Sequence, residues 1–170
     1  MIFRLSQKLN TKIKAGPLKA LPLHENSLAD WSAHLFAADR TQYILLSNTK
    51  SLYSAVMFGK GITDASHFIE RALSSIRDFL EADGQEFVYH RFIAPSSASV
   101  RFAKALDRSV TGSMNDLIGH ATEWLAQGDV APFAVGFRLN EMLLSALADS
   151  GSTYGVPREA LKRLVSAVQS

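Results

Sequence analysis

The segment Asp-Arg-Ser-Val-Thr-Gly-Ser-Met-Asn-Asp, residues 107–116, is the first candidate for a functional surface. An Arg-Ser pair precedes a glycine, and the apolar spacing that follows predicts a helix from about residue 114. The first turn of a helix presents unpaired N–H groups and a partial positive charge, so an anion such as phosphate would fit there. The sequence therefore predicts a non-enzymatic binding module. Its ligand-binding residues would be Arg108, Ser109, Ser113, Asn115 and Asp116, with Asn48 and Asn140 as candidate neighbours.

The same segment also has a purely structural interpretation. Ser113 and Asp116 stand three residues apart, which is the spacing of a capping box with Asp in place of the usual Glu. Arg108 would then simply pair with a carboxylate. The glycine spacing and the Gly-Lys pair of a phosphate-binding loop are both missing, so a nucleotide hydrolase of that type is excluded. Capping and anion binding both stay open at this point.

A metal site is the alternative hypothesis. Asp116, His120 and Glu123 follow one another at i, i+4 and i+7, which places three potential ligands on one side of a helix. A divalent ion would need a further ligand, which His34 or His90 would supply if the fold brought either close. This pattern suits a metal-assisted hydrolase, whereas a solvated polar helix face explains the same spacing more simply. Whether the chain is an enzyme stays open.

Composition limits the remaining functions. The chain has 170 residues, 47% of them hydrophobic, which is enough for one globular domain spanning residues 1–170. The net charge is only +2, so a dedicated nucleic-acid binder is not expected. Weak nucleic-acid binding through basic helices is the third hypothesis. Its cations would be Arg4, Lys8, Lys12, Lys14 and Lys19 near the N-terminus, and Arg158, Lys162 and Arg163 in the last helix.

The absence of cysteine excludes disulfides, thiolate metal sites and cysteine nucleophiles. No apolar stretch is long enough for a signal peptide or a membrane span, so a cytoplasmic location is expected. The expected partners are a protein or a small anion, with no cofactor and no membrane. A homo-oligomer is compatible with the sequence.

The elements that must position these residues begin with an antiparallel meander. Apolar runs alternate with polar turns at 39–41 and 48–50 across residues 31–58, and such short connections force neighbouring strands to be antiparallel. Further strands are predicted at 2–5 and 87–93. The predicted fold is therefore α+β, with a mainly antiparallel sheet of about five strands and helices packed on it.

Three helices have clear signals. Ser6 is a suitable N-cap for a helix that follows the first strand. Residues 65–80 carry an apolar stripe at spacings of three and four, and Pro157 suits the first position of a last helix. Two regions, 100–105 and 131–148, fit either a strand or a helix. The alternation from Phe133 to Leu139 favours a strand in the second of these.

Several segments together are similar to one family. They are residues 1–9, 30–35, 43–51 and 107–116, with a weaker match at 139–141. On these segments the chain resembles a family of small bacterial proteins known only as a domain of unknown function. The most specific segment is Asp-Arg-Ser-Val-x-Gly-Ser-Met-Asn-Asp, where Thr111 stands at a position that is often aliphatic in the family. The resemblance implies a bacterial, cytosolic α+β protein with no established activity.

Overall fold

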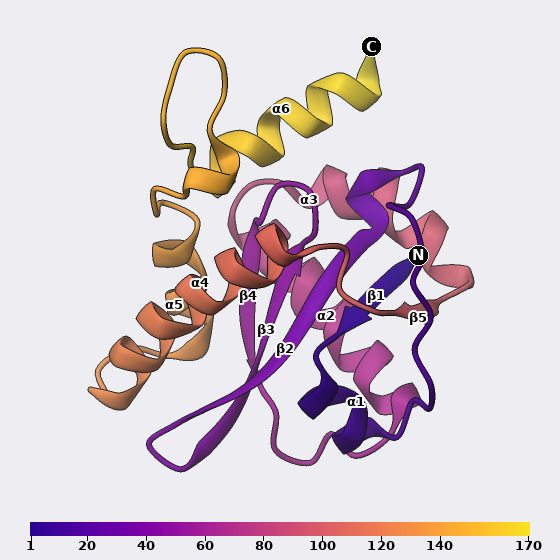
Figure 1. The fold of residues 1–170 in the computed structure, drawn as a ribbon, viewed down its shortest axis with the longest axis vertical. Coiled ribbons are helices and arrows are strands. Elements are labelled where there is room, and N and C mark those ends of the chain that lie inside the picture. The colour runs from indigo at the N-terminus through magenta and orange to yellow at the C-terminus, as the bar shows by residue number, and fades with distance from the viewer.

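A mixed five-stranded sheet forms the centre of the computed structural model, which describes residues 1–170 (Figure 1). The strands are β1 (Ile2–Leu5), β2 (Asp30–Ala38), β3 (Thr41–Asn48), β4 (Ser54–Phe58) and β5 (Arg101–Ala103), in the spatial order β4-β3-β2-β1-β5. β2, β3 and β4 pair antiparallel, which confirms the predicted meander. β1 pairs in parallel with both β2 and β5, so the prediction of a mainly antiparallel sheet is wrong.

The length of the connections explains the parallel pairs. A parallel pair needs a crossover of a dozen or more residues, and residues 6–29 between β1 and β2 provide one. The turns at 39–40 and 49–53 are too short for that and close hairpins instead. β5, in the region that the sequence left ambiguous, pairs with the free side of β1 and becomes the edge strand.

Helices cover both faces of the sheet. They are α1 (Gln7–Ile13), α2 (Ala65–Ala82), α3 (Glu86–Val88), α4 (Arg108–Ala126), α5 (Pro132–Leu139) and α6 (Pro157–Gln169). The predicted caps hold, because the Ser6 side chain accepts from the N–H of Leu9 and Pro157 begins α6. No helix combines the length and the apolarity that crossing a bilayer requires.

Two apolar clusters lie on opposite faces of the sheet, between the strands and the helices that cover them. On one face, Phe68 and Ile76 of α2 pack with Ile44 of β3. On the other face, Met114 of α4 packs with Leu45, the next residue of β3. Successive side chains of a strand point to opposite faces, so β3 is buried on both sides and reads as a continuous apolar run.

Residues 87–93, predicted as a strand, are helical. α3 continues into a π-helical turn, η2 (Tyr89–Ile93), and then into a 3₁₀ turn, η3 (Ala94–Ala98). Val88 and Ile93 are the buried residues here, and both join the cluster beneath α2. Their five-residue separation matches one π turn, which strand or α-helix periodicity does not detect.

α5 occupies the stretch 133–139 that the alternation predicted as a strand. The same alternation places Val135 and Leu139 four residues apart, and both are buried on one helix face. Gly136 lies against the Phe79 ring of α2, where an added Cβ would stand 2.6 Å from a ring carbon. A close contact with a distant aromatic ring therefore fixes this helix, and local periodicity contains no sign of it.

Candidate functional site

A cleft of about 520 Å³ opens at the carboxyl ends of β1 and β5. The residues that follow these two strands form part of its wall, and α1, residues 16–18, β2 and α4 complete it. The polar side chains in this wall are Ser6, Gln7, Asn10, His34, Lys104 and Thr111. Throughout, "the cleft" means this hollow.

The topology explains why a hollow forms there. β1 and β5 are parallel neighbours, and the chain continues from β1 into α1 on one face of the sheet and from β5 into α4 on the other face. The two segments therefore separate at the carboxyl ends of these strands. In open sheets with parallel strands, such a switch point is where ligands bind most often.

A buried ion pair holds the walls of the cleft together. The guanidinium of Arg4 donates from Nε and Nη2 to the two carboxylate oxygens of Asp30, each at 2.8 Å. Its other N–H groups donate to the carbonyl oxygens of Leu21, Pro22 and Lys104. All five guanidinium N–H groups are therefore satisfied. We call this arrangement the Arg4 clamp; it joins β1, β2, the 17–29 segment and the residue that follows β5.

His34 is the buried side chain of the cleft that makes no hydrogen bond with the rest of the protein. It comes from β2 and is only 9% exposed. Its ring nitrogens make no hydrogen bond within the protein, and burial lowers the pKa of the imidazole below its ordinary value. The ring is consequently neutral at pH 7, with one nitrogen as a donor and the other as an acceptor.

Two further polar groups of the cleft have unused bonding capacity. Asn10 donates from Nδ2 to the carbonyl of Gly16 at 2.8 Å, which fixes the orientation of its amide, and its buried Oδ1 has no partner. The Ser6 hydroxyl oxygen accepts from the N–H groups of Leu9 and Leu35. Both bonds use the oxygen of Ser6 as acceptor, so its proton is uncommitted.

The predicted segment at 107–116 lies beside this cleft, but its local structure differs from the prediction. α4 begins at Arg108, and Asp107 is its N-cap, with Oδ1 accepting from the N–H of Val110 at 2.9 Å. The predicted helix start near Met114 and the predicted capping by Ser113 are therefore wrong. Asp107 competes successfully because its short carboxylate, placed before three good helix positions, caps as well as serine does.

A second hollow of about 460 Å³ adjoins the cleft and shares Ala105 and Thr111 with it. Arg108 and Asn115, two of the predicted ligand residues, also line this "α4 hollow", and both are exposed. The other predicted residues lie elsewhere. Ser109 is exposed outside the hollow, Ser113 is buried within α4, and Asp116 faces a different depression.

Asn48 and Asn140 were predicted as neighbours of this surface, but both are completely buried and do not reach it. Asn48 donates to the main-chain carbonyls of Ser27 and Asp30 and stabilises the turn after β3. Asn140 bonds both the N–H and the carbonyl of Ser54, at 2.7 and 2.9 Å, and so joins the end of α5 to β4. Each replaces main-chain pairing where the sheet or the helix ends.

The predicted metal ligands do share one helix face. Asp116, His120 and Glu123 line a depression of about 430 Å³ between α4 and residues 142–144, and all three are exposed. However, no three His, Asp or Glu side chains come together in a group able to hold a metal ion. His34, considered as the additional ligand, lines the cleft instead. The predicted metal constellation is therefore not formed.

The predicted basic surfaces are partly consumed by internal pairs. Arg4, the first cation of the predicted basic stretch, lies in β1, where a strand was predicted, and is only 1% exposed. Arg158 of α6 pairs with Asp83 at 3.0 Å and with Glu141 at 2.7 Å. Two of the expected cations thus hold the fold together and are unavailable to a phosphate backbone.

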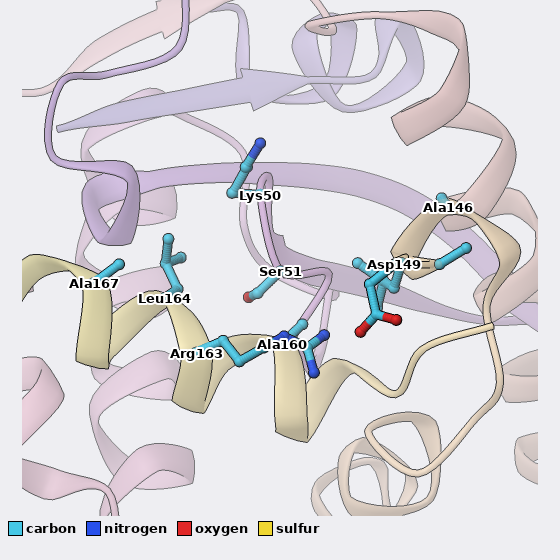
Figure 2. Close-up of a pocket in the computed structure, with 10 residues that line it drawn as sticks. Lys50, Ser51, Ala146, Asp149, Ala160, Arg163, Leu164 and Ala167 are labelled. Carbon is cyan, nitrogen blue, oxygen red and sulfur yellow. The ribbon is translucent and has the colours of Figure 1, made fainter. Parts of the chain in front are cut away.

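A third hollow, of about 370 Å³, lies between α6 and the turn after β3 (Figure 2). Figure 2 shows Ser51 between Leu164 of α6 and Asp149 of the preceding loop. Its lining combines six apolar residues with Lys50, Asp149 and Arg163, and the buried hydroxyl of Ser51 is already donated to Asn48. Unlike the cleft, this hollow has no buried polar side chain that lacks a partner.

Ser6 and Asn10 were not predicted as site residues, and His34 was predicted only as a further metal ligand. Ser6 had a cap signal, which is correct, and the cap leaves its proton free. His34 lies in an alternating strand, where a lone histidine has no distinguishing pattern. Only the parallel pairing of β1 with β2, which places Leu5 opposite Ala33, brings these residues to one cleft.

Comparison with known proteins gives one match. A family model described as "Domain of unknown function (DUF6933)" matches residues 2–160. No curated protein and no solved structure matches the chain. The matched range includes every residue of the cleft and of the α4 hollow. It leaves out Arg163, Leu164 and Ala167 of the third hollow.

Proposed function

Because the chain belongs to the family described as "Domain of unknown function (DUF6933)", we propose its function from its own geometry: a non-enzymatic module that binds a small anionic molecule. The observation that carries this proposal is the cleft of about 520 Å³ at the switch point of the sheet, with the α4 hollow beside it. Its volume falls within the range of ordinary small-molecule sites, about 300–1,000 Å³.

The charges around the two hollows favour an anion. Lys104 lines the cleft and Arg108 lines the α4 hollow, and both side chains are exposed. Asp107 is the one carboxylate among the lining residues, and it is occupied in capping α4. The N-terminus of α4 adds a partial positive charge at the same place. The net field therefore attracts negative charge.

We propose binding in preference to catalysis because the cleft lacks an activated nucleophile. Nucleophilic catalysis needs the attacking group within hydrogen-bond reach of a base. Ser6 uses its oxygen to accept hydrogen bonds from main-chain N–H groups, and His34 has no hydrogen bond to any side chain.

The cysteine-free composition suits the reducing cytoplasm, which is the proposed location.

Titration of the protein with inorganic phosphate at low salt, followed by NMR amide shifts, tests the proposal. Shifts should concentrate at Lys104, Arg108 and Thr111, and the double variant Lys104→Ala/Arg108→Ala should bind about tenfold more weakly, because two charge-assisted contacts are lost. Arg77→Ala is the matched control, since Arg77 is exposed on α2 and pairs only with Asp78. Unchanged affinity in the double variant, or no binding at millimolar phosphate, would refute the proposal.

A further inference from the structure

The floor of the cleft holds polar groups that the protein itself leaves unpaired. His34 is about nine-tenths buried, lines the cleft and makes no hydrogen bond within the chain. Polar side chains this deeply buried are nearly always bonded within the protein, so the open bonding capacity of the imidazole faces the cleft. Asn10 Oδ1 in the same wall also has no partner, but it is closed off from solvent. His34 is therefore the buried group of this wall that a ligand can complete.

The bonding capacity of these groups specifies the complementary chemistry. The free proton of Ser6 requires an acceptor, and the neutral ring of His34 offers one donor and one acceptor. A hydroxyl group donates and accepts at once, so adjacent hydroxyls satisfy both side chains. A carboxylate or a fully ionised phosphate group only accepts, and it would leave the acceptor nitrogen of His34 unpaired.

The shape and lining of the cleft favour an aliphatic ligand over a nucleobase. Apart from the imidazole of His34, the lining contains no aromatic ring, and its apolar part consists of residues such as Leu5, Pro17 and Leu18. Base recognition ordinarily uses stacking on aromatic faces. A saturated, hydroxylated body meets the same wall without that need.

This inference rests on the proposed function and deepens it. We propose that the ligand is an aliphatic polyhydroxylated anion of the sugar-phosphate class. Its hydroxyl groups bind His34 and Ser6 in the cleft, and its anionic group stays beside Lys104 and Arg108.

Ribose 5-phosphate and inorganic phosphate, compared by calorimetric titration, test this assignment. Ribose 5-phosphate should bind the wild-type protein at least about tenfold more tightly, which is about 1.4 kcal/mol. In His34→Leu the advantage should fall to about threefold or less, while the affinity for inorganic phosphate stays unchanged. His90→Leu is the matched control, because His90 is exposed and outside the cleft, and it should keep the full advantage.

A measurement on the unmodified protein covers the case in which His34→Leu does not fold. The imidazole ¹⁵N resonances of His34 should move on addition of ribose 5-phosphate and stay in place with inorganic phosphate. Equal affinity for the two probes, or silent His34 resonances, overturns the assignment of a hydroxylated ligand. If inorganic phosphate still binds through Arg108 in that case, the proposed anion-binding function survives; if neither probe binds, both proposals fail.

Discussion

Replacement of Arg4 by methionine is the sharpest test of how this fold holds its cleft. The change keeps a long unbranched side chain but removes the five donated hydrogen bonds of the clamp. Asp30, which is completely buried, would keep only the N–H of His24 as a partner. The variant therefore leaves a carboxylate in the interior without its counter-charge.

The expected magnitude follows from this geometry. Breaking a buried ion pair by removing one partner costs about 3–5 kcal/mol. The carbonyl groups of Leu21, Pro22 and Lys104 are only partly buried, so water takes over some of their bonding. We expect Arg4→Met to lower the free energy of unfolding by about 4 kcal/mol, a large part of the total of about 5–15 kcal/mol that is typical of a domain.

Urea denaturation followed by tryptophan fluorescence measures this loss, because Trp31 is buried in the adjacent core. The double variant Arg4→Met/Asp30→Leu should be more stable than Arg4→Met alone by about 3–5 kcal/mol, since no charge is then left unpaired. Arg77→Ala, which breaks the exposed pair with Asp78, should change stability by less than about 1 kcal/mol.

Either of two results would contradict this account of the Arg4 clamp. A loss below about 1 kcal/mol in Arg4→Met would mean that the guanidinium is solvated or that the pair is not formed. A double variant less stable than Arg4→Met would mean that the remaining carboxylate is not the source of the destabilisation.

Three further predictions concern buried polar groups. The Tyr53 hydroxyl donates to Asp83, and burial, followed by that bond, raises the pKa of Tyr53; Tyr53→Phe should lower the free energy of unfolding by about 1–3 kcal/mol in urea denaturation, and no loss would exclude the bond. Asn140→Ala leaves the N–H and the carbonyl of Ser54 unpaired, so we expect a loss of about 2–4 kcal/mol and faster amide exchange at Ser54, with unchanged exchange as the contrary result. The pKa of His34 is lowered in the folded protein, so below pH 6.5 the unfolded state binds this proton more tightly and the free energy of unfolding falls with falling pH. His34→Gln should therefore flatten the plot of unfolding free energy against pH below 6.5 by at most about 1.4 kcal/mol per pH unit. Identical plots for the variant and the wild-type protein would contradict this.

Much of the fold was accessible from local signals. The 31–58 meander followed from turn lengths, and α2 followed from an apolar stripe whose spacing only a helix satisfies. Ser6 and Pro157 were correctly placed because caps depend on neighbouring main-chain atoms alone. Two of the failures were non-local. The parallel pairing of β1 depends on where a long connection returns, and α5 depends on the contact between Gly136 and a ring on another helix.

The candidate site divides along the same line. Arg108 and Asn115 were found because their polar segment is contiguous in sequence, and the structure places both beside the cleft. Ser6 caps α1, Asn10 lies within that helix and His34 lies on β2, and each taken alone is an ordinary residue. A site whose residues are brought together by strand pairing has no contiguous sequence motif. Its unpaired polar groups can be identified only from the three-dimensional structure.

The Arg4 clamp fixes the walls that carry the unpaired groups of the cleft. Arg4 precedes the last residue of β1, and it also bonds the carbonyl of Lys104, whose side chain lines the cleft. One side chain therefore fixes the end of the central strand and the opposite wall together. His34 lies on β2, the strand that carries Asp30, so the clamp fixes the backbone that bears this imidazole. The proposed ligand would then meet polar groups already in position, which reduces the ordering that binding requires.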